Sequence, residues 1–180
     1  LYDPKTHLVF RDSRYFDKKG EFGEQVFWSR GMGWVVAGLA NTINQLDEND
    51  PNRSYYTKHF IEMAYAIKKL QKHDGTWASS LLAHEKMTNK EASGTAFFTY
   101  AFAWGIKNGL LSHEEFWPNT EKAWSALTSF IHPDGKLGHV QQIGDKPGES
   151  PHDSTQIYGT GAFLLAGSII YDLAKEQKRH

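Results

Sequence analysis

The sequence predicts an all-α protein in which apolar inner helices alternate with amphipathic outer helices, as in an α/α toroid or a solenoid. Three segments begin with two small residues that are separated by one other residue, and each continues as a long apolar run. They are GMGWVVAGLA from Gly31, GTAFFTYAFA from Gly94 and GTGAFLLAGS from Gly159. Their starts are almost equally spaced along the chain, which marks an internal repeat. Amphipathic segments and Asp-Gly turns lie between them. Together these observations predict two layers of helices.

The three apolar runs are the predicted inner helices. Their apolar residues are spaced as in a helix rather than alternating as in a strand. A helix that is apolar on most sides must be covered on more than one side, and the amphipathic helices can cover it. A closed ring of six hairpins needs about twice this length. The 180 residues are therefore expected to form one region, 1–180, that supplies about three helical hairpins, or half a toroid.

The predicted outer helices are residues 51–72 and 112–131. The first begins with Pro51 and places Phe60, Met63 and Ile67 on one face, with Lys and Glu opposite. The second begins with Ser112-His113-Glu114-Glu115, the pattern of a capping box. Both segments thus have one apolar face to pack on an inner helix.

An Asp-Gly turn follows each outer helix, at Asp74-Gly75 in the first copy and at Asp134-Gly135 in the second. Such a turn before alternating residues is typical of a short β excursion. Residues 3–16 resemble a third, degenerate copy. Trp77 and His139 follow the two turns and are candidates for contacts at the rim of a binding site.

Composition excludes several classes of function. The net charge of −1 gives no basic surface for nucleic acid. Without cysteine, there is no disulfide or thiolate site. The histidines lack the spacing of a known metal motif, so we expect no metal site. The longest apolar run, Ala162 to Ile170, is short of a membrane span. The paired glycines lack the third glycine of a nucleotide-binding loop.

The strongest candidate site residues are Trp28, Arg30 and Trp34, in FWSRGMGW. Arg30 can form a forked contact with a carboxylate, and an indole can stack on a sugar ring. The alternative is an arginine paired with a nearby aspartate and two tryptophans in the core. The glycines of this segment are explained equally well by close helix packing.

The starts of the other two inner helices give further candidates. Glu91 and Ser93 precede the second inner helix, where Glu91 is also explained by the helix dipole alone. Before the third, Asp153 or Ser154 is most simply an N-cap. Tyr158 is the better candidate there for contacting a ligand.

The segment FWSRGMGWVVAGLA resembles the W-x-R-G-N-G-W signature of glycoside hydrolase families 88 and 105, the unsaturated glucuronyl and rhamnogalacturonyl hydrolases. The segments EASGTAFFTYAFAWGIKNGLL and STQIYGTGAFLLAGSIIY resemble later inner helices of the same group. The resemblance covers essentially the whole chain. It implies an (α/α)6 barrel, of which this chain is the C-terminal half.

The resemblance also implies an activity. These enzymes remove a Δ4,5-unsaturated uronic acid from lyase-generated oligosaccharides of the pectin, rhamnogalacturonan or glycosaminoglycan type. An aspartic acid protonates the double bond and activates water at C5, and the resulting hemiketal opens; no cofactor is used. Trp28, Arg30 and Trp34 would line the sugar pocket, with Arg30 opposite the substrate carboxylate.

The chain departs from the family pattern in three ways. The catalytic aspartate is expected upstream of these residues, so the chain has no catalytic residue of its own. Met32 replaces the usual asparagine. Where many members have a sugar-contacting histidine, this chain has FRDSRYF, so either Arg11 or Asp12 is the substitute or the site binds a different sugar.

Two hypotheses follow. The first is a portion of a bacterial glycoside hydrolase, cytoplasmic or periplasmic, whose partner is an unsaturated oligosaccharide. The second is a catalytically silent carbohydrate-binding or structural half-barrel. Either would leave inner helices exposed along the open edge of the half-barrel, so we expect a homodimer or a domain swap through that edge.

Overall fold

The computed structural model describes residues 1–177 and is mainly helical. The α-helices of this region are α1 (Ser29–Gln45), α2 (Arg53–Lys68), α3 (Ala92–Lys107), α4 (His113–Thr128) and α5 (Ile157–Gln177). Two short 3-10 helices span Ser13–Tyr15 and Leu81–Ala83, and the short strands β1 (Tyr2–Asp3) and β2 (Leu8–Val9) form an antiparallel hairpin. The predicted all-α fold class is thus confirmed, with one short hairpin near the N-terminus.

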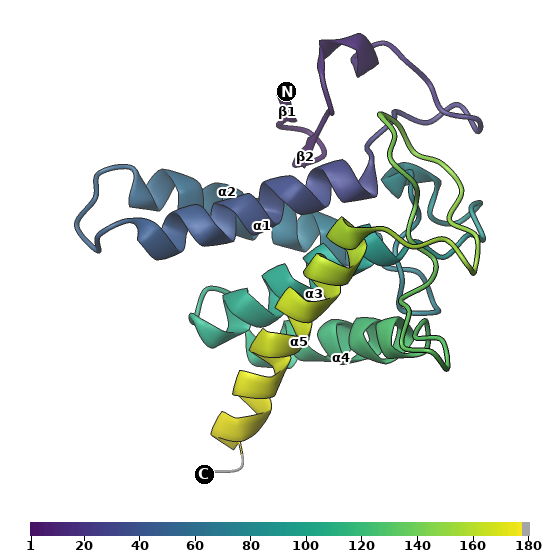
Figure 1. Ribbon diagram of the computed structural model, residues 1–180. Helices are drawn as coiled ribbons and strands as arrows, with labels where there is room; N and C mark the ends of the chain where they lie inside the picture. Colours follow the sequence, from purple (N-terminus) through teal and green to yellow (C-terminus); the bar gives the residue numbers. More distant parts are fainter. Residues whose placement is uncertain (178–180) are drawn as a thin grey trace.

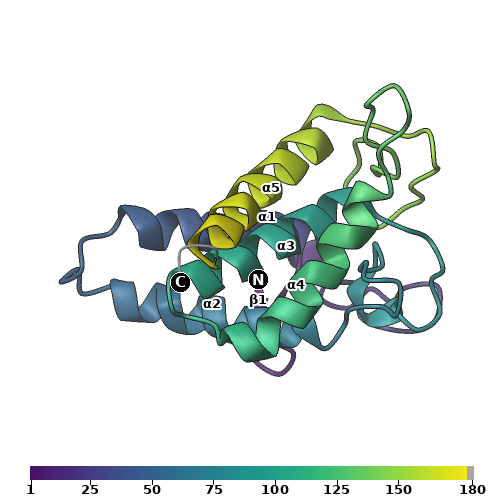
Figure 2. The same ribbon diagram turned by 90° about the horizontal axis from the view of Figure 1, so that it is seen from below.

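The helices form two layers around α3. α1 and α5 pack on α3, α2 packs on α1, and α4 packs on α3, as Figures 1 and 2 show. The predicted inner helices are α1, α3 and α5, and the outer ones are α2 and α4. The chain therefore supplies two complete hairpins and an inner helix whose outer partner is not among residues 1–177.

α3 is the centre of the core. Every residue from Ala92 to Gly105 is buried, because neighbouring helices cover it on several sides. Phe98 and Phe102 lie edge-on to the Trp77 ring at 5.2 and 5.8 Å. The prediction of Trp77 as a rim residue is wrong. The turn folds this side chain inward, where it is fully buried and donates from Nε1 to the Ile67 carbonyl at 2.7 Å.

Both Asp-Gly turns have the same backbone geometry. Gly75 and Gly135 have φ angles of +88° and +87°. Their amides donate to the carbonyls of Lys72 and His132 at 3.0 and 2.9 Å. The expected β excursions are single bridges, Trp77 to Glu91 and Ile131 to Leu137, rather than strands.

The start of α5 differs from the sequence prediction. α5 begins at Ile157, so neither Asp153 nor Ser154 is its N-cap. The Ser154 hydroxyl instead donates to the Val140 carbonyl, and Asp153 pairs with Lys136. Both residues therefore belong to the loop that precedes the helix.

α5 is also the most apolar exposed helix. Ile157–Glu176 has a mean hydropathy of 1.4 and is, by length and composition alone, long enough to cross a membrane. This differs from the expectation based on Ala162 to Ile170. An inner helix of a ring has the same composition, because it is covered on most sides.

Candidate functional site

The inner helices begin at one end of the molecule, where the long loops gather (Figure 1). Arg30, Ser93 and Tyr158 occupy the same position in the repeat, because each directly precedes the glycine that opens its apolar run. Trp28 and Glu91 precede α1 and α3 directly as their N-caps. The repeat therefore places the candidate residues at equivalent positions around one opening.

Arg30 is the centre of the site. Its guanidinium carbon lies 4.4 Å from the ring centroid of Trp28 and 4.5 Å from that of Tyr158. Cation–π attraction stabilises both contacts. Only 4% of Arg30 is exposed. Burial lowers the pKa of Arg30, while Tyr158 and Glu91 act in the opposite direction. The guanidinium remains charged at neutral pH, because an arginine side chain is not deprotonated in proteins.

Three hydrogen bonds hold this guanidinium in place. Nη1 donates to the Gln141 carbonyl at 2.6 Å and to the Tyr158 hydroxyl at 3.0 Å, and Nη2 donates to the Gln142 carbonyl at 3.0 Å. An arginine has five N–H donors. Nε–H has no protein acceptor within residues 1–177. Arg30 is therefore a fixed positive charge that retains donors for a ligand.

Tyr158 completes the stack. Its hydroxyl accepts from Arg30 and donates to the Gln141 carbonyl at 2.6 Å. A neutral phenol can do both. Burial raises the pKa of Tyr158, Arg30 lowers it and Glu91 raises it, with a net increase. The tyrosine therefore stays protonated and holds its two partners together.

Gln141 joins most of these residues and was not among those predicted from the sequence. Its Oε1 accepts from the Trp28 indole at 3.0 Å, and its Nε2 donates to the Lys146 carbonyl at 2.7 Å. Its backbone amide donates to Glu91 Oε1 at 3.3 Å. The only sequence signal was a pair of glutamines in the segment after the second Asp-Gly turn.

Glu91 and Ser93 hold the start of α3 in place next to the site. Glu91 is fully buried. Its carboxylate accepts from the Ser93 amide and hydroxyl at 3.0 and 2.6 Å and from the Gly94 amide at 2.6 Å. These contacts satisfy free N–H groups at the start of α3. In this conformation the two side chains bind the protein itself.

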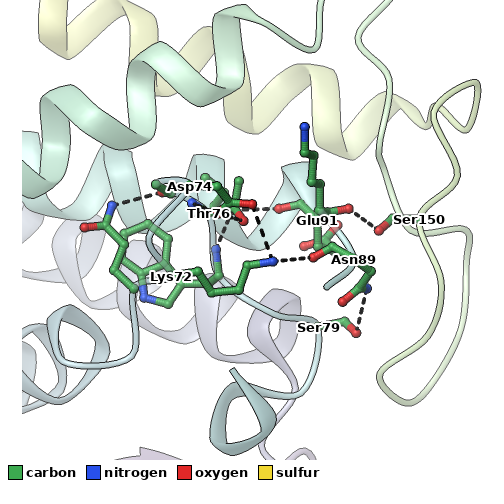
Figure 3. Close-up of polar contacts among 12 residues, drawn as sticks. Lys72, Asp74, Thr76, Ser79, Asn89, Glu91 and Ser150 are labelled. Carbon is green, nitrogen blue, oxygen red and sulfur yellow. Dashed lines mark hydrogen bonds and ion pairs between the residues drawn. The ribbon is translucent and has the colours of Figure 1, made fainter. Parts of the chain in front are cut away.

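A second polar network connects the loops around Glu91 (Figure 3). Lys72 Nζ donates to the Asn89 carbonyl at 2.7 Å and lies 3.6 Å from Asp74. Asn89 Nδ2 donates to the Ser79 hydroxyl at 3.3 Å, and the Ser150 hydroxyl donates to the Lys90 carbonyl. These contacts tie residues 72–79, 89–91 and 148–150 into one support.

Two predicted residues are not part of the Trp28–Arg30–Tyr158 cluster. The Trp34 side chain lies two turns along α1, is 55% exposed, and packs on Phe97 with 4.4 Å between ring centroids. Arg11 pairs with Asp12. Asp12 also binds Arg14 and caps the first 3-10 helix.

A cavity of about 420 Å³ lies beside the cluster. Ser80 lines it, and the Ser80 backbone forms a bridge with that of Trp28. The cavity combines aromatic, cationic and acidic side chains, namely Tyr15, Phe22, Lys18, Lys19, Lys146 and Glu24. Such a lining suits a polar ligand with an apolar face and an anionic substituent.

Comparison with known proteins gives consistent results. A sequence model of Glycosyl Hydrolase Family 88 matches residues 1–173. The chain is 42% identical over 168 residues to an unsaturated 3S-rhamnoglycuronyl hydrolase of an Alteromonas species, covering 93% of this chain and 41% of that protein. It is 42% identical over 179 residues to the protein of the same name from Formosa agariphila, covering 96% of this chain and 48% of that protein.

A solved structure shows the same arrangement of helices. The glycosyl hydrolase family 88 protein from Bacteroides vulgatus is 39% identical, with a TM-score of 0.89. The match covers 94% of this chain and 50% of that one. The chain thus spans about half the length of the proteins it resembles.

Proposed function

The chain belongs to glycosyl hydrolase family 88, and we propose that the whole protein removes a Δ4,5-unsaturated uronic acid from lyase-generated oligosaccharides. Its helices form part of an (α/α)6 barrel. The observation that carries the proposal is Arg30, held between the Trp28 and Tyr158 rings with Nε–H still lacking a protein acceptor among residues 1–177.

The chemistry of this site suits a planar sugar acid. The guanidinium is complementary to the substrate carboxylate, which is conjugated with the C4=C5 double bond. The Trp28 ring offers an apolar face to the sugar. Because three hydrogen bonds fix Arg30 before substrate arrives, little free energy is lost in ordering it.

The hydration step needs an acid that donates a proton to C4 while water adds at C5. The product is a hemiketal, which opens and releases the sugar that was attached to C1. From the family resemblance, we expect an aspartic acid upstream of these residues to supply the proton. This chain would contribute the carboxylate contact and the stacking wall.

The names of the two relatives specify a rhamnoglycuronyl unit, so we propose rhamnose as the neighbouring sugar. The cavity beside Ser80 is a candidate for it. Lys18 and Lys146 line this cavity and suit an anionic substituent on that sugar. We expect Lys146→Met to raise KM for a substituted oligosaccharide and to leave KM unchanged for an unsubstituted one.

The test of the activity is loss of the ultraviolet absorbance of the unsaturated uronate. We expect the full-length protein to remove this absorbance from lyase-generated oligosaccharides and to leave saturated glycosides intact. Substitution Arg30→Lys should lower kcat/KM by at least about tenfold, since a forked carboxylate contact is lost. Arg53→Lys is the matched control, because Arg53 contacts the Ile43 and Leu46 carbonyls at the far end of α1, and it should have wild-type kinetics.

Binding of the oligosaccharide without loss of absorbance would identify a catalytically silent carbohydrate-binding protein and contradict the proposal. Wild-type kinetics in Arg30→Lys would contradict the role of Arg30 in binding the carboxylate.

A further inference from the structure

A second cluster of polar side chains lies outside the candidate site, between the Asp134-Gly135 turn and the loop before α5. His132, His152 and Asp153 each bring one metal-ligating atom within 4.8 Å of the others. Both imidazole Nδ1 atoms lie 3.6 Å from Asp153 Oδ1. Ligands around a tetrahedral zinc ion are separated by about 3.3 Å, given metal–ligand bonds near 2 Å. A small inward movement would bring the three atoms to that spacing.

We propose that His132, His152 and Asp153 form a binding site for one zinc-type divalent cation, with water as the fourth ligand. Two imidazole nitrogens and one carboxylate favour zinc over magnesium or calcium, which prefer oxygen ligands. His152 and Asp153 are exposed, so the cation and the water have access from solvent.

The hydrogen bonding of His132 supports this assignment. Its Nε2 lies 3.0 Å from the His152 carbonyl oxygen. A carbonyl can only accept, so this nitrogen carries the proton and Nδ1 presents its lone pair towards Asp153. A backbone carbonyl on the second nitrogen is the usual support of a metal-binding histidine. The His132 side chain is only 10% exposed, so the ring is held in this orientation.

The repeat gives a second reason. Lys72 occupies the position of His132 in the earlier copy, since each lies at the same distance before the glycine of its Asp-Gly turn. Lys72 Nζ donates to the Asn89 carbonyl, just as His132 Nε2 contacts the His152 carbonyl. Both side chains connect an Asp-Gly turn to the loop before the next inner helix. Only in the later copy does the residue also offer a metal ligand, beside a second histidine and an aspartate.

One charge opposes the cation. Lys136 Nζ lies 3.6 Å from the same Asp153 Oδ1. Its side chain is one-third exposed and can turn into solvent, but the cation must displace it. This competition separates the two explanations of the cluster. If the cluster is a metal site, removing Lys136 strengthens metal binding; if it is only an ion-pair network, removal creates no metal site.

A bound cation would affect the candidate site indirectly. The loop that it anchors, from His139 to Gln156, carries the Gln141 and Gln142 carbonyls that hold Arg30. We therefore expect bound zinc to slow proteolysis of this loop. This effect does not depend on the proposed hydrolase activity.

The experiment is a titration of the metal-free, full-length protein with Zn²⁺ in competition with a chromophoric chelator. We expect one equivalent of Zn²⁺ to bind to this cluster, and neither Mg²⁺ nor Ca²⁺ to replace it. His152→Ala and Asp153→Asn change exposed side chains. Each should weaken zinc binding by at least about tenfold. Lys136→Met should strengthen it.

The matched control is His73→Ala, an exposed histidine at the other Asp-Gly turn, which should leave the titration unchanged. The proposal is wrong if no zinc binds, if binding is unaffected by His152→Ala and Asp153→Asn, or if Lys136→Met weakens it.

Discussion

Arg30 combines two roles at the scale of a single residue. It is the candidate ligand for a carboxylate, and it also holds the Gln141 and Gln142 carbonyls at the start of a long loop. A buried charge without partners would be costly, and these carbonyls and the two aromatic rings compensate for its loss of water. The proposed carboxylate contact and the stability of the loop therefore depend on the same guanidinium.

We expect Arg30→Lys to lower the free energy of unfolding by about 2 kcal/mol. A single ammonium cannot contact both carbonyls and fill the space between the Trp28 and Tyr158 rings. Arg53→Lys is the matched control, because one Arg53 nitrogen, Nη1, contacts the carbonyls of Ile43 and Leu46 at 2.7 Å each. An ammonium can replace that nitrogen. Urea denaturation of both variants checks this, and equal losses would contradict it.

The sequence could identify part of this cluster for a physical reason. Arg30 and Tyr158 occupy the same position of the repeat and Trp28 lies two residues before Arg30, so the ring geometry brings the three residues together. Gln141 could not be identified, because its role depends on backbone groups and on the path of its loop. Arg11 pairs with its sequence neighbour Asp12, and the sequence alone did not show which partner Arg11 would bind.

Asp74 gives a prediction of pH dependence. Burial raises its pKa, but hydrogen bonds from the Thr76 hydroxyl and amide, with Lys72, lower it by more. The folded-state pKa is therefore below the unfolded value of about 3.9. The unfolded chain binds the proton more readily, so the stability contributed by Asp74 is complete above that value and is lost as the pH falls through the folded-state pKa.

We expect Asp74→Asn to lower the free energy of unfolding at neutral pH by about 1 kcal/mol, with a smaller difference from wild type at acid pH. Denaturation at a series of pH values checks this. Asp134→Asn is the comparison at the second turn, where the Lys136 amide contacts the aspartate at 3.1 Å. A difference for Asp74→Asn that grows as the pH falls would contradict the sign.

At the scale of an element, the Asp-Gly turns are a matched pair. Gly75 and Gly135 share a left-handed φ, which costs a residue with a Cβ about 1–2 kcal/mol. Their surroundings differ. A Cβ on Gly75 would lie 2.6 Å from the Lys122 backbone oxygen, whereas one on Gly135 would meet nothing within 4 Å.

We therefore expect Gly135→Ala to lower the free energy of unfolding by about 1 kcal/mol, the cost of the backbone conformation alone. Gly75→Ala should cost more, because the Lys122 carbonyl on α4 must also move. Thermal and chemical denaturation of the two variants measure the difference. Equal losses would mean that α4 adjusts freely to the turn.

Most elements could be predicted from local signals. Apolar runs marked the inner helices, and Ser112 caps α4 as its sequence pattern indicated, with its hydroxyl accepting from the Glu115 amide. The predicted outer helices 51–72 and 112–131 are shorter, ending at Lys68 and Thr128. Their last predicted residues form the approach to the Asp-Gly turns. A turn and a final helical turn have similar sequences, so the boundary depends on packing.

At the scale of the whole molecule, the inner layer is uncovered on one side. Trp34, Leu164 and Tyr171 are large apolar side chains that are more than half exposed. They lie on α1 and α5, and α5 has no outer helix among the described residues. The relatives are about twice as long as this chain, so we expect the rest of the barrel to cover this face.

This arrangement predicts the behaviour of residues 1–180 expressed alone. Contiguous apolar surface drives association, so we expect the isolated segment to form a dimer through α5, either directly or by exchange of that helix. Burial of one leucine contributes about 1.5–3 kcal/mol, so Leu164→Glu should weaken the dimer by at least about tenfold. Tyr55→Glu is the control on the outer helix α2, where the side chain is similarly exposed, and it should leave the dimer intact. Sedimentation analysis measures each dissociation constant.

In the full-length protein, Leu164→Glu should instead lower stability, because there the side chain packs inside one barrel. A monodisperse monomer of the isolated segment, or equal effects of Leu164→Glu and Tyr55→Glu, would show that α5 is not the associating surface.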